Sequence, residues 1–291
     1  MRFQKQHSTS LTFAMGFYFF EDPSEIRQPL IAVIEAFAEH FPQRFSRISD
    51  TGDTFRNFAK SKKAATFLRD QIAHHDFYHS LFLMLSDAHK DTPPTQRILF
   101  WGRTLYPEFK SRTPNYLYFE LPVTTDISTC WQLFQDAFHV CNFYLGVGNF
   151  VMSADDDSMP RSGATAAREV RDSQYILHTF DGTFRNHSYL TLLERKSSQF
   201  LIHPSQFIGV GREIKNNLKE LNLAFPIDEK LIRHTNDDCV LVRADTTDEL
   251  RVLSETLSPF YGDVECPQMF WKPDPWKEWV SNAKSTKELR V

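Results

Sequence analysis

Cysteine and glycine are scarce in this sequence, and the shortage excludes several kinds of site. Four cysteines and ten glycines occur in 291 residues. No two cysteines form a CxxC pair, so neither a disulfide-stapled fold nor a compact zinc site is indicated. Cys130 and Cys141 fall on a helical pattern, where we expect them to be reduced, buried and equivalent to small apolar side chains.

Long apolar runs are absent as well. No stretch reaches the roughly 18 apolar residues that a membrane-spanning helix needs. The apolar residues 11–20 lead directly into Glu21, Asp22 and Pro23 without a small-residue cleavage site, which does not fit a signal peptide. The sequence therefore predicts a cytoplasmic protein that makes no contact with a membrane.

A basic excess is also missing, because the formal net charge is −4 at pH 7. Binding to duplex DNA or RNA needs a positive field, so we do not expect a nucleic acid partner. The chain is 41% hydrophobic and contains 27 phenylalanines, which is enough apolar surface to fold around a large core.

What is present is an alternation of strand-like and helix-like segments. Short runs rich in β-branched and aromatic residues predict strands at 11–20, 78–85, 97–105, 115–123, 143–153, 189–193, 199–203 and 239–244. Apolar residues at helical spacing predict helices at about 22–41, 62–75, 126–141, 164–172, 212–221 and 246–257. The three successive strands between residues 78 and 123 favour antiparallel pairing.

This order of segments predicts the α+β fold class. We expect two mixed halves of antiparallel strands with helices packed on one face, in a pseudo-duplicated arrangement. The halves cover about residues 1–157 and 164–291 and are joined by a connection rich in Ser, Met, Pro and Gly at 158–163. Together they form a single compact domain of residues 1–291.

Three helix starts carry recognisable signals. Residues 22–25 fit a capped start, although Pro29 forces either a kink or a later start. Asp126 stands where a capping side chain is expected for its helix. Thr246 and Glu249 form a capping-box pattern for the last predicted helix.

The densest group of metal-capable side chains lies between residues 74 and 79. It consists of His74, His75, Asp76 and His79. On a helix, His75 and His79 would share one face, and a metal-dependent hydrolase that uses this group is one alternative function. The group straddles the expected end of a helix, however, and no HExxH pattern is present. We therefore expect a solvated polar junction and no metal ligand.

Two short groups are candidate partner-binding residues. They are Asp155, Asp156, Asp157, Trp271, Trp276 and Trp279. The aspartates lack the DxDxDG spacing of a calcium loop, which favours either a solvated turn or an acidic contact loop. The tryptophans lie among prolines, and core, a cap over a sheet edge, and a contact surface are three interpretations of them.

No motif assembles a catalytic centre. Two GxG elements lie at residues 146–148 and 209–211, but the first lacks a third glycine and the second lacks a preceding strand and a GK[ST] ending. A turn or a close backbone approach explains both. There is no GxSxG elbow, and Cys239 leads an apolar strand. We expect no enzyme activity, no catalytic residue and no cofactor.

Four passages share features of one protein family. They are residues 11–41, residues 131–151 with the segment Asn142, Phe143, Tyr144, Leu145 and Gly146, the segment from Ser188 to Leu193, and residues 240–259. In these passages the chain resembles the TsiV-like immunity proteins of the bacterial type VI secretion system (T6SS), formerly a domain of unknown function. The family's glycine-rich late segment is poorly matched around residues 209–223.

The resemblance implies a protein partner, a cognate effector toxin. The toxin would be neutralised by occlusion of its active site or by locking of its conformation, which needs complementary shape and charge but no chemistry. The family implies no catalytic residues. A third candidate function is an adaptor subunit of a secretion apparatus. The sequence is also consistent with a homodimer.

Overall fold

The structure is a computed structural model of the whole chain. It describes residues 9–41, 44–50, 55–58, 63–88, 94–104, 114–154, 179–180, 200–201, 205–223 and 230–260. Within these ranges, no helix combines the length and the apolar character needed to cross a membrane. The helix predicted at 164–172 and the strand predicted at 189–193 lie outside the described residues.

One 11-stranded sheet organises the described residues. Its strands are β1 (Thr9–Phe19), β2 (Arg47–Ser49), β3 (Arg56–Asn57), β4 (Leu81–Ser86), β5 (Arg97–Gly102), β6 (Asn115–Pro122), β7 (Leu145–Ala154), β8 (Thr179–Phe180), β9 (Phe207–Gly211), β10 (Ile232–Thr235) and β11 (Cys239–Arg243). Their order is β10-β11-β9-β7-β1-β6-β5-β4-β2-β3, and β8 pairs with β7. The pattern did not predict β2, β3, β8, β9 or β10.

The first strand of the chain lies in the middle of this sheet. β1 pairs with β6 on one side and with β7 on the other, and both pairings are antiparallel. The three successive strands β4, β5 and β6 are also antiparallel, as predicted. The pairing of β7 with β9 continues the sheet from the first predicted half into the second. The α+β fold class is confirmed.

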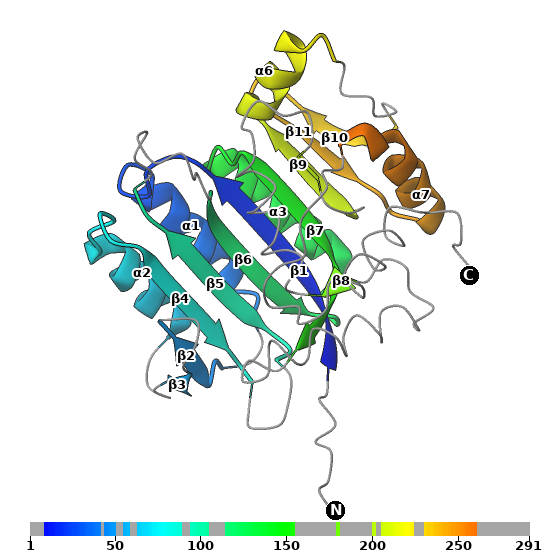
Figure 1. Cartoon of the computed structure of the whole chain (residues 1–291). Coiled ribbons are helices and arrows are strands. Elements are labelled where there is room, and N and C mark those ends of the chain that lie inside the picture. Colours follow the sequence, from blue (N-terminus) through cyan, green and yellow to red (C-terminus); the bar gives the residue numbers. More distant parts are fainter. Residues whose placement is uncertain are drawn as a thin grey trace, which may run out of the picture.

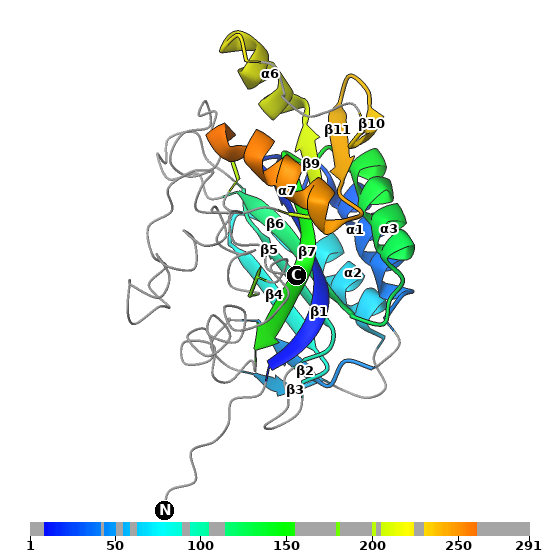
Figure 2. The same cartoon turned by 90° about the vertical axis from the view of Figure 1, so that its right-hand side faces the viewer.

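The helices cover opposite faces of the sheet. α1 (Arg27–Ala38), α2 (Ala64–His74) and α3 (Ile127–Val140) contribute to one buried cluster, and we call their side of the sheet the helical face. α6 (Arg212–Glu220), α7 (Thr247–Thr256) and the 3-10 helix η2 (Ser258–Phe260) belong to a second cluster on the other side, the second face. Figures 1 and 2 show the two layers. Each half thus places its helices on one face, but the two halves use different faces.

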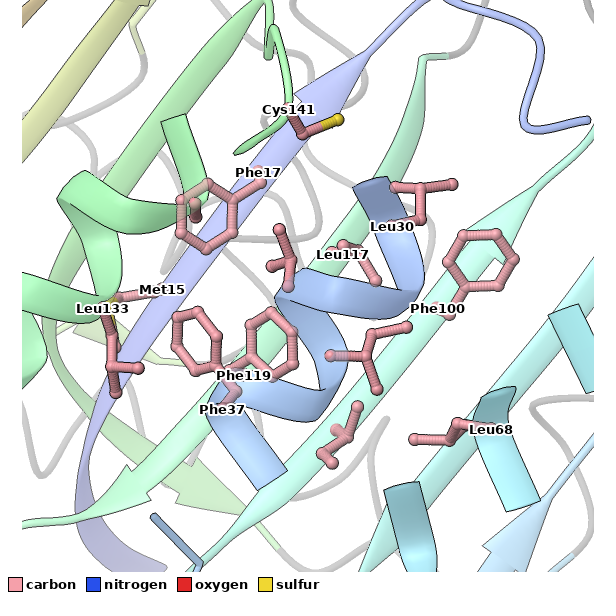
Figure 3. Packing of buried hydrophobic residues seen from close by; sticks show 14 of the residues in the cluster. Met15, Phe17, Leu30, Phe37, Leu68, Phe100, Leu117, Phe119, Leu133 and Cys141 are labelled. Atoms are coloured by element: carbon pink, nitrogen blue, oxygen red, sulfur yellow. The ribbon is translucent and has the colours of Figure 1, made fainter. Parts of the chain in front are cut away.

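Phenylalanine fills the helical face. Phe37 of α1 stacks on Phe119 of β6 with ring centroids 3.9 Å apart. Phe17 of β1 lies 5.3 Å from Phe134 and 4.9 Å from Phe143, again between ring centroids. Figure 3 shows part of this packing. Burying one such side chain stabilises the fold by roughly 1.5–3 kcal/mol, so this layer supplies much of the driving force for folding.

Paired glycines bring α3 close to the sheet. Gly146 of β7 stands opposite Gly209 of β9. A Cβ atom on Gly146 would lie 2.5 Å from the ring of Phe138, and one on Gly209 would lie 2.4 Å from the same ring. The prediction of a close approach is therefore confirmed. The expectation that no strand precedes Gly211 is wrong, because β9 ends at this residue and leads directly into α6.

The helix starts follow the sequence signals only in part. α1 begins at Arg27, which puts Pro29 in its first turn, so the later start is confirmed. Asp22 accepts hydrogen bonds from the backbone and hydroxyl of Ser24, at 2.8 and 2.7 Å, in the turn before the helix. Asp126 precedes α3, but its side chain makes no capping hydrogen bond, so that expected cap is wrong. The capping box of Thr246 and Glu249 at the start of α7 is confirmed.

Candidate functional site

The second face carries three rows of side chains that run across the strands in register. Alternate residues of a strand point to the same face, so the pairings fix the members of each row. The polar row is Ser86, Arg97, Glu120, Ala14 and Asn149; the middle row is Met84, Leu99, Tyr118, Gly16 and Val147; the aromatic row is Phe82, Trp101, Tyr116, Tyr18 and Leu145. The face therefore changes from polar to aromatic along the strands.

The polar row contains a buried ion pair. The guanidinium of Arg97 donates to Oε1 of Glu120 at 2.7 Å, and the two side chains are 1% and 0% exposed. The hydroxyl of Tyr118 donates to the same oxygen at 2.6 Å. The hydroxyl of Ser153 on β7 donates to Oε2, also at 2.6 Å, across the intervening strand β1. One carboxylate thus joins strands β5, β6 and β7.

This arrangement favours a structural role over acid–base catalysis. Both oxygens of Glu120 already accept charge-assisted hydrogen bonds, which stabilise the ionised carboxylate. A general base would need a free oxygen that faces the substrate proton. Breaking a buried pair is costly because it leaves one charge without its partner. The ion pair instead fixes the register of the central strands.

The aromatic row ends in a stacked group. Trp101 and Tyr116 stack with ring centroids 5.9 Å apart, and the ring of Tyr18 lies 6.3 Å from Tyr116. Burial, with the neighbouring Tyr116 as a second cause, raises the pKa of Tyr18 well above its usual value. Phe82, Trp101 and Tyr116 are only partly buried. This end of the face therefore leaves part of its aromatic surface exposed to solvent.

The candidate partner-binding residues from the sequence are not placed by this structure. Asp155, Asp156, Asp157, Trp271, Trp276 and Trp279 all lie outside the described residues. Their role in binding stays a prediction.

The histidine group lies at the junction between α2 and β4. α2 ends at His74, and His75 has extended backbone angles, φ −71° and ψ 139°, so His75 and His79 do not share a helical face. A ring nitrogen of His75 lies 2.9 Å from the backbone oxygen of His79. Among the described residues, no group of three or more His, Cys, Asp or Glu side chains could hold a metal ion. The geometry on which the hydrolase alternative depended is not present.

The described cysteines are buried in the core. Burial raises the pKa of the Cys130 and Cys141 thiols to about 12, and it raises the pKa of Cys239 as well. Because the thiolate is the reactive form, none of the three is suited to act as a nucleophile. Their predicted role as small apolar core residues is confirmed.

The rows of the second face were not predicted, although the sequence contains a feature that indicates the buried ion pair. Arg97 is the only charged residue of β5, and Glu120 is the only charged residue of β6. An isolated charge in an apolar strand is a candidate for a buried pair, because it is buried only when compensated. The pairing itself could not be read from the sequence, since it depends on the register of β5 against β6.

Comparison with known proteins gives a match in fold only. No protein-family model matches the chain, and no curated protein matches it in sequence. Among solved structures, the Pseudomonas aeruginosa T6SS protein PA0821 is similar, with a TM-score of 0.68 and 12% sequence identity. The similarity covers 94% of this chain and 82% of that one. At this identity, the likeness shows that the two chains share a fold.

Proposed function

We propose that this chain is an immunity protein that binds a cognate T6SS effector toxin and neutralises it by occluding its active site. The observation that carries the proposal is the fold shared with a T6SS protein over 94% of the chain. The resemblance of residues 11–41, 131–151, 188–193 and 240–259 to TsiV-like immunity proteins supports the same function. Membership of that family is part of the proposal.

A rigid scaffold suits this function. Occlusion needs a large complementary surface and little loss of conformational freedom on binding. The paired strands, the phenylalanine layer and the buried ion pair of Arg97 and Glu120 all favour such rigidity. We place the protein in the cytoplasm of the toxin-producing cell, without a nucleic acid or membrane partner, and cell fractionation would test that location.

The proposal predicts that a toxin gene lies beside this one, and the test is protection of cells from that toxin. The toxin is expressed in a laboratory bacterium alone and together with this protein, and growth is measured. We expect growth to stop with the toxin alone and to recover with both. Toxicity that persists at equal expression of both proteins would reject the proposal.

Gene deletion and metal analysis separate this function from the two alternatives. An adaptor subunit of a secretion apparatus predicts that deletion of this gene impairs secretion and leaves toxin sensitivity unchanged. A metal-dependent hydrolase predicts stoichiometric zinc, manganese or iron in the purified protein. The immunity function instead predicts that the deletion makes the cells sensitive and leaves secretion intact.

A further inference from the structure

An arginine side chain lies at the end of the aromatic row. Arg103 follows Trp101 by two positions, which directs it to the second face, and its guanidinium carbon lies 5.3 Å from the Trp101 ring centroid. Its Nε is buried and has no hydrogen-bond partner among the described residues. Among the ion pairs of the described residues, none involves Arg103.

The backbone around Arg103 is held in place. Its own N–H donates to Oδ1 of Asn115 at 2.9 Å, and the N–H of Thr104 donates to the backbone oxygen of Phe77 at 2.8 Å. A guanidinium that stacks on an aromatic face keeps its edge N–H groups directed sideways, where a carboxylate can accept two of them. The charge is therefore positioned before a partner arrives, which lowers the entropic cost of binding.

The surroundings of Arg103 indicate what kind of partner fits. Phe82, Trp101 and Tyr116 are partly buried and stand side by side on β4, β5 and β6. Arginine, tryptophan and tyrosine are the residue types most enriched at the energetic centres of protein interfaces. The Arg103 side chain is only partly buried, so a carboxylate can approach its charge from the solvent side.

We propose that Arg103, with Trp101 and Tyr116, is the anchor site for the effector, and that it binds an aspartate or glutamate side chain on that protein. An apolar residue next to this carboxylate would pack on the exposed part of Trp101. This inference rests on the proposed immunity function and adds the contact surface and the chemistry of the partner.

The experiment measures the affinity of purified variants for the toxin encoded beside this gene, with the toxin inactivated in its own active site. Arg103→Glu reverses the charge, and Arg103→Met removes it but retains a side chain that can cover Trp101. Lys63→Glu makes the same change of charge at an exposed position before α2, on the helical face, and is the matched control. Thermal unfolding of each variant shows whether it folds like the wild type.

We expect Arg103→Glu and Arg103→Met to weaken binding by at least about 30-fold, as for a central interface arginine, and Lys63→Glu to bind like the wild type. A toxin variant with one acidic residue changed to lysine should restore binding to Arg103→Glu. If Arg103→Met folds and binds within about threefold of the wild type, the anchor site is wrong even though the wild type protects cells. If the wild type neither binds nor protects, the immunity function itself fails.

Discussion

The two faces of the sheet are built by the same strands and both bury an apolar cluster, but the second face adds a buried ion pair. Phe119 points to the helical face, where it stacks on Phe37 within an apolar layer. Glu120, the next residue, points to the second face and is bound by Arg97, Tyr118 and Ser153. Apolar packing depends mainly on volume, whereas a buried ion pair depends on every partner. The helical face should therefore be sensitive to size, and the polar row of the second face to charge.

The largest expected effect comes from breaking the ion pair. Glu120→Ala leaves Arg97 as a buried charge without its carboxylate, so we expect the free energy of unfolding to fall by about 3–5 kcal/mol. Chemical denaturation at neutral pH, followed by circular dichroism, measures this difference.

A double variant separates the cost of the unpaired charge from the value of the pair. Arg97→Met with Glu120→Leu removes both charges and fills the space with apolar atoms. We expect the double variant to be about 2 kcal/mol more stable than Glu120→Ala alone. If it is less stable than the single variant, the ion pair contributes net stability and the contrast between the faces is smaller than we argue.

A change of volume should have the next largest effect, on the helical face. A methyl group at position 209 would lie 2.4 Å from the ring of Phe138, so Gly209→Ala should destabilise the protein by about 1–3 kcal/mol. Phe138→Leu in the same chain should recover part of the loss, because it removes the ring that the methyl group meets. A loss that Phe138→Leu does not reduce would mean that the glycine is needed for another reason.

The helices and strands predicted correctly are those whose own residues form a clear apolar pattern. α3 and α7 repeat apolar residues at helical spacing, and β1, β6 and β7 are long apolar runs; all of these were predicted close to their observed bounds. β2, β3 and β10 are two to four residues long and carry no pattern. They are strands because neighbouring strands pair with them, and that information is not local.

The candidate site was less predictable because it depends on register. Arg97 and Glu120 are 23 residues apart, and only the pairing of β5 with β6 places them opposite each other. Arg103 and Trp101 are close in sequence, but the lack of an acceptor for the Arg103 Nε is a property of the packed chain. The site residues predicted from the sequence instead belong to groups of one residue type, which can be recognised without knowledge of strand pairing.

Alkaline pH should destabilise the fold through the buried thiol of Cys130 on α3. Burial raises the pKa of Cys130 from 9.0 to about 12, so the unfolded chain loses its thiol proton first as the pH rises. The stability contribution of this group is therefore complete below pH 9 and is lost between pH 9 and 12. Across that window we expect a loss of up to about 1.4 kcal/mol per pH unit from this thiol.

Cys130→Ala should lose less stability per pH unit than the wild type, because alanine cannot titrate. Leu133→Ala, at a buried neighbouring position of α3, should keep the wild-type dependence although it also leaves a cavity. Unfolding free energies measured from pH 8 to 11 provide the comparison. Equal slopes for all three proteins would show that Cys130 does not titrate during unfolding.

The smallest effect concerns how the helices on the two faces begin. At the start of α7, the Thr246 hydroxyl accepts a hydrogen bond from the N–H of Glu249 at 3.1 Å, whereas the Asp126 side chain makes no such bond at the start of α3. Thr246→Ala should therefore cost about 1 kcal/mol, and Asp126→Ala at most a few tenths. The two values come from denaturation curves recorded under identical conditions. A larger loss for Asp126→Ala would mean that α3 depends on its first turn, and that apolar packing alone does not hold the helical face.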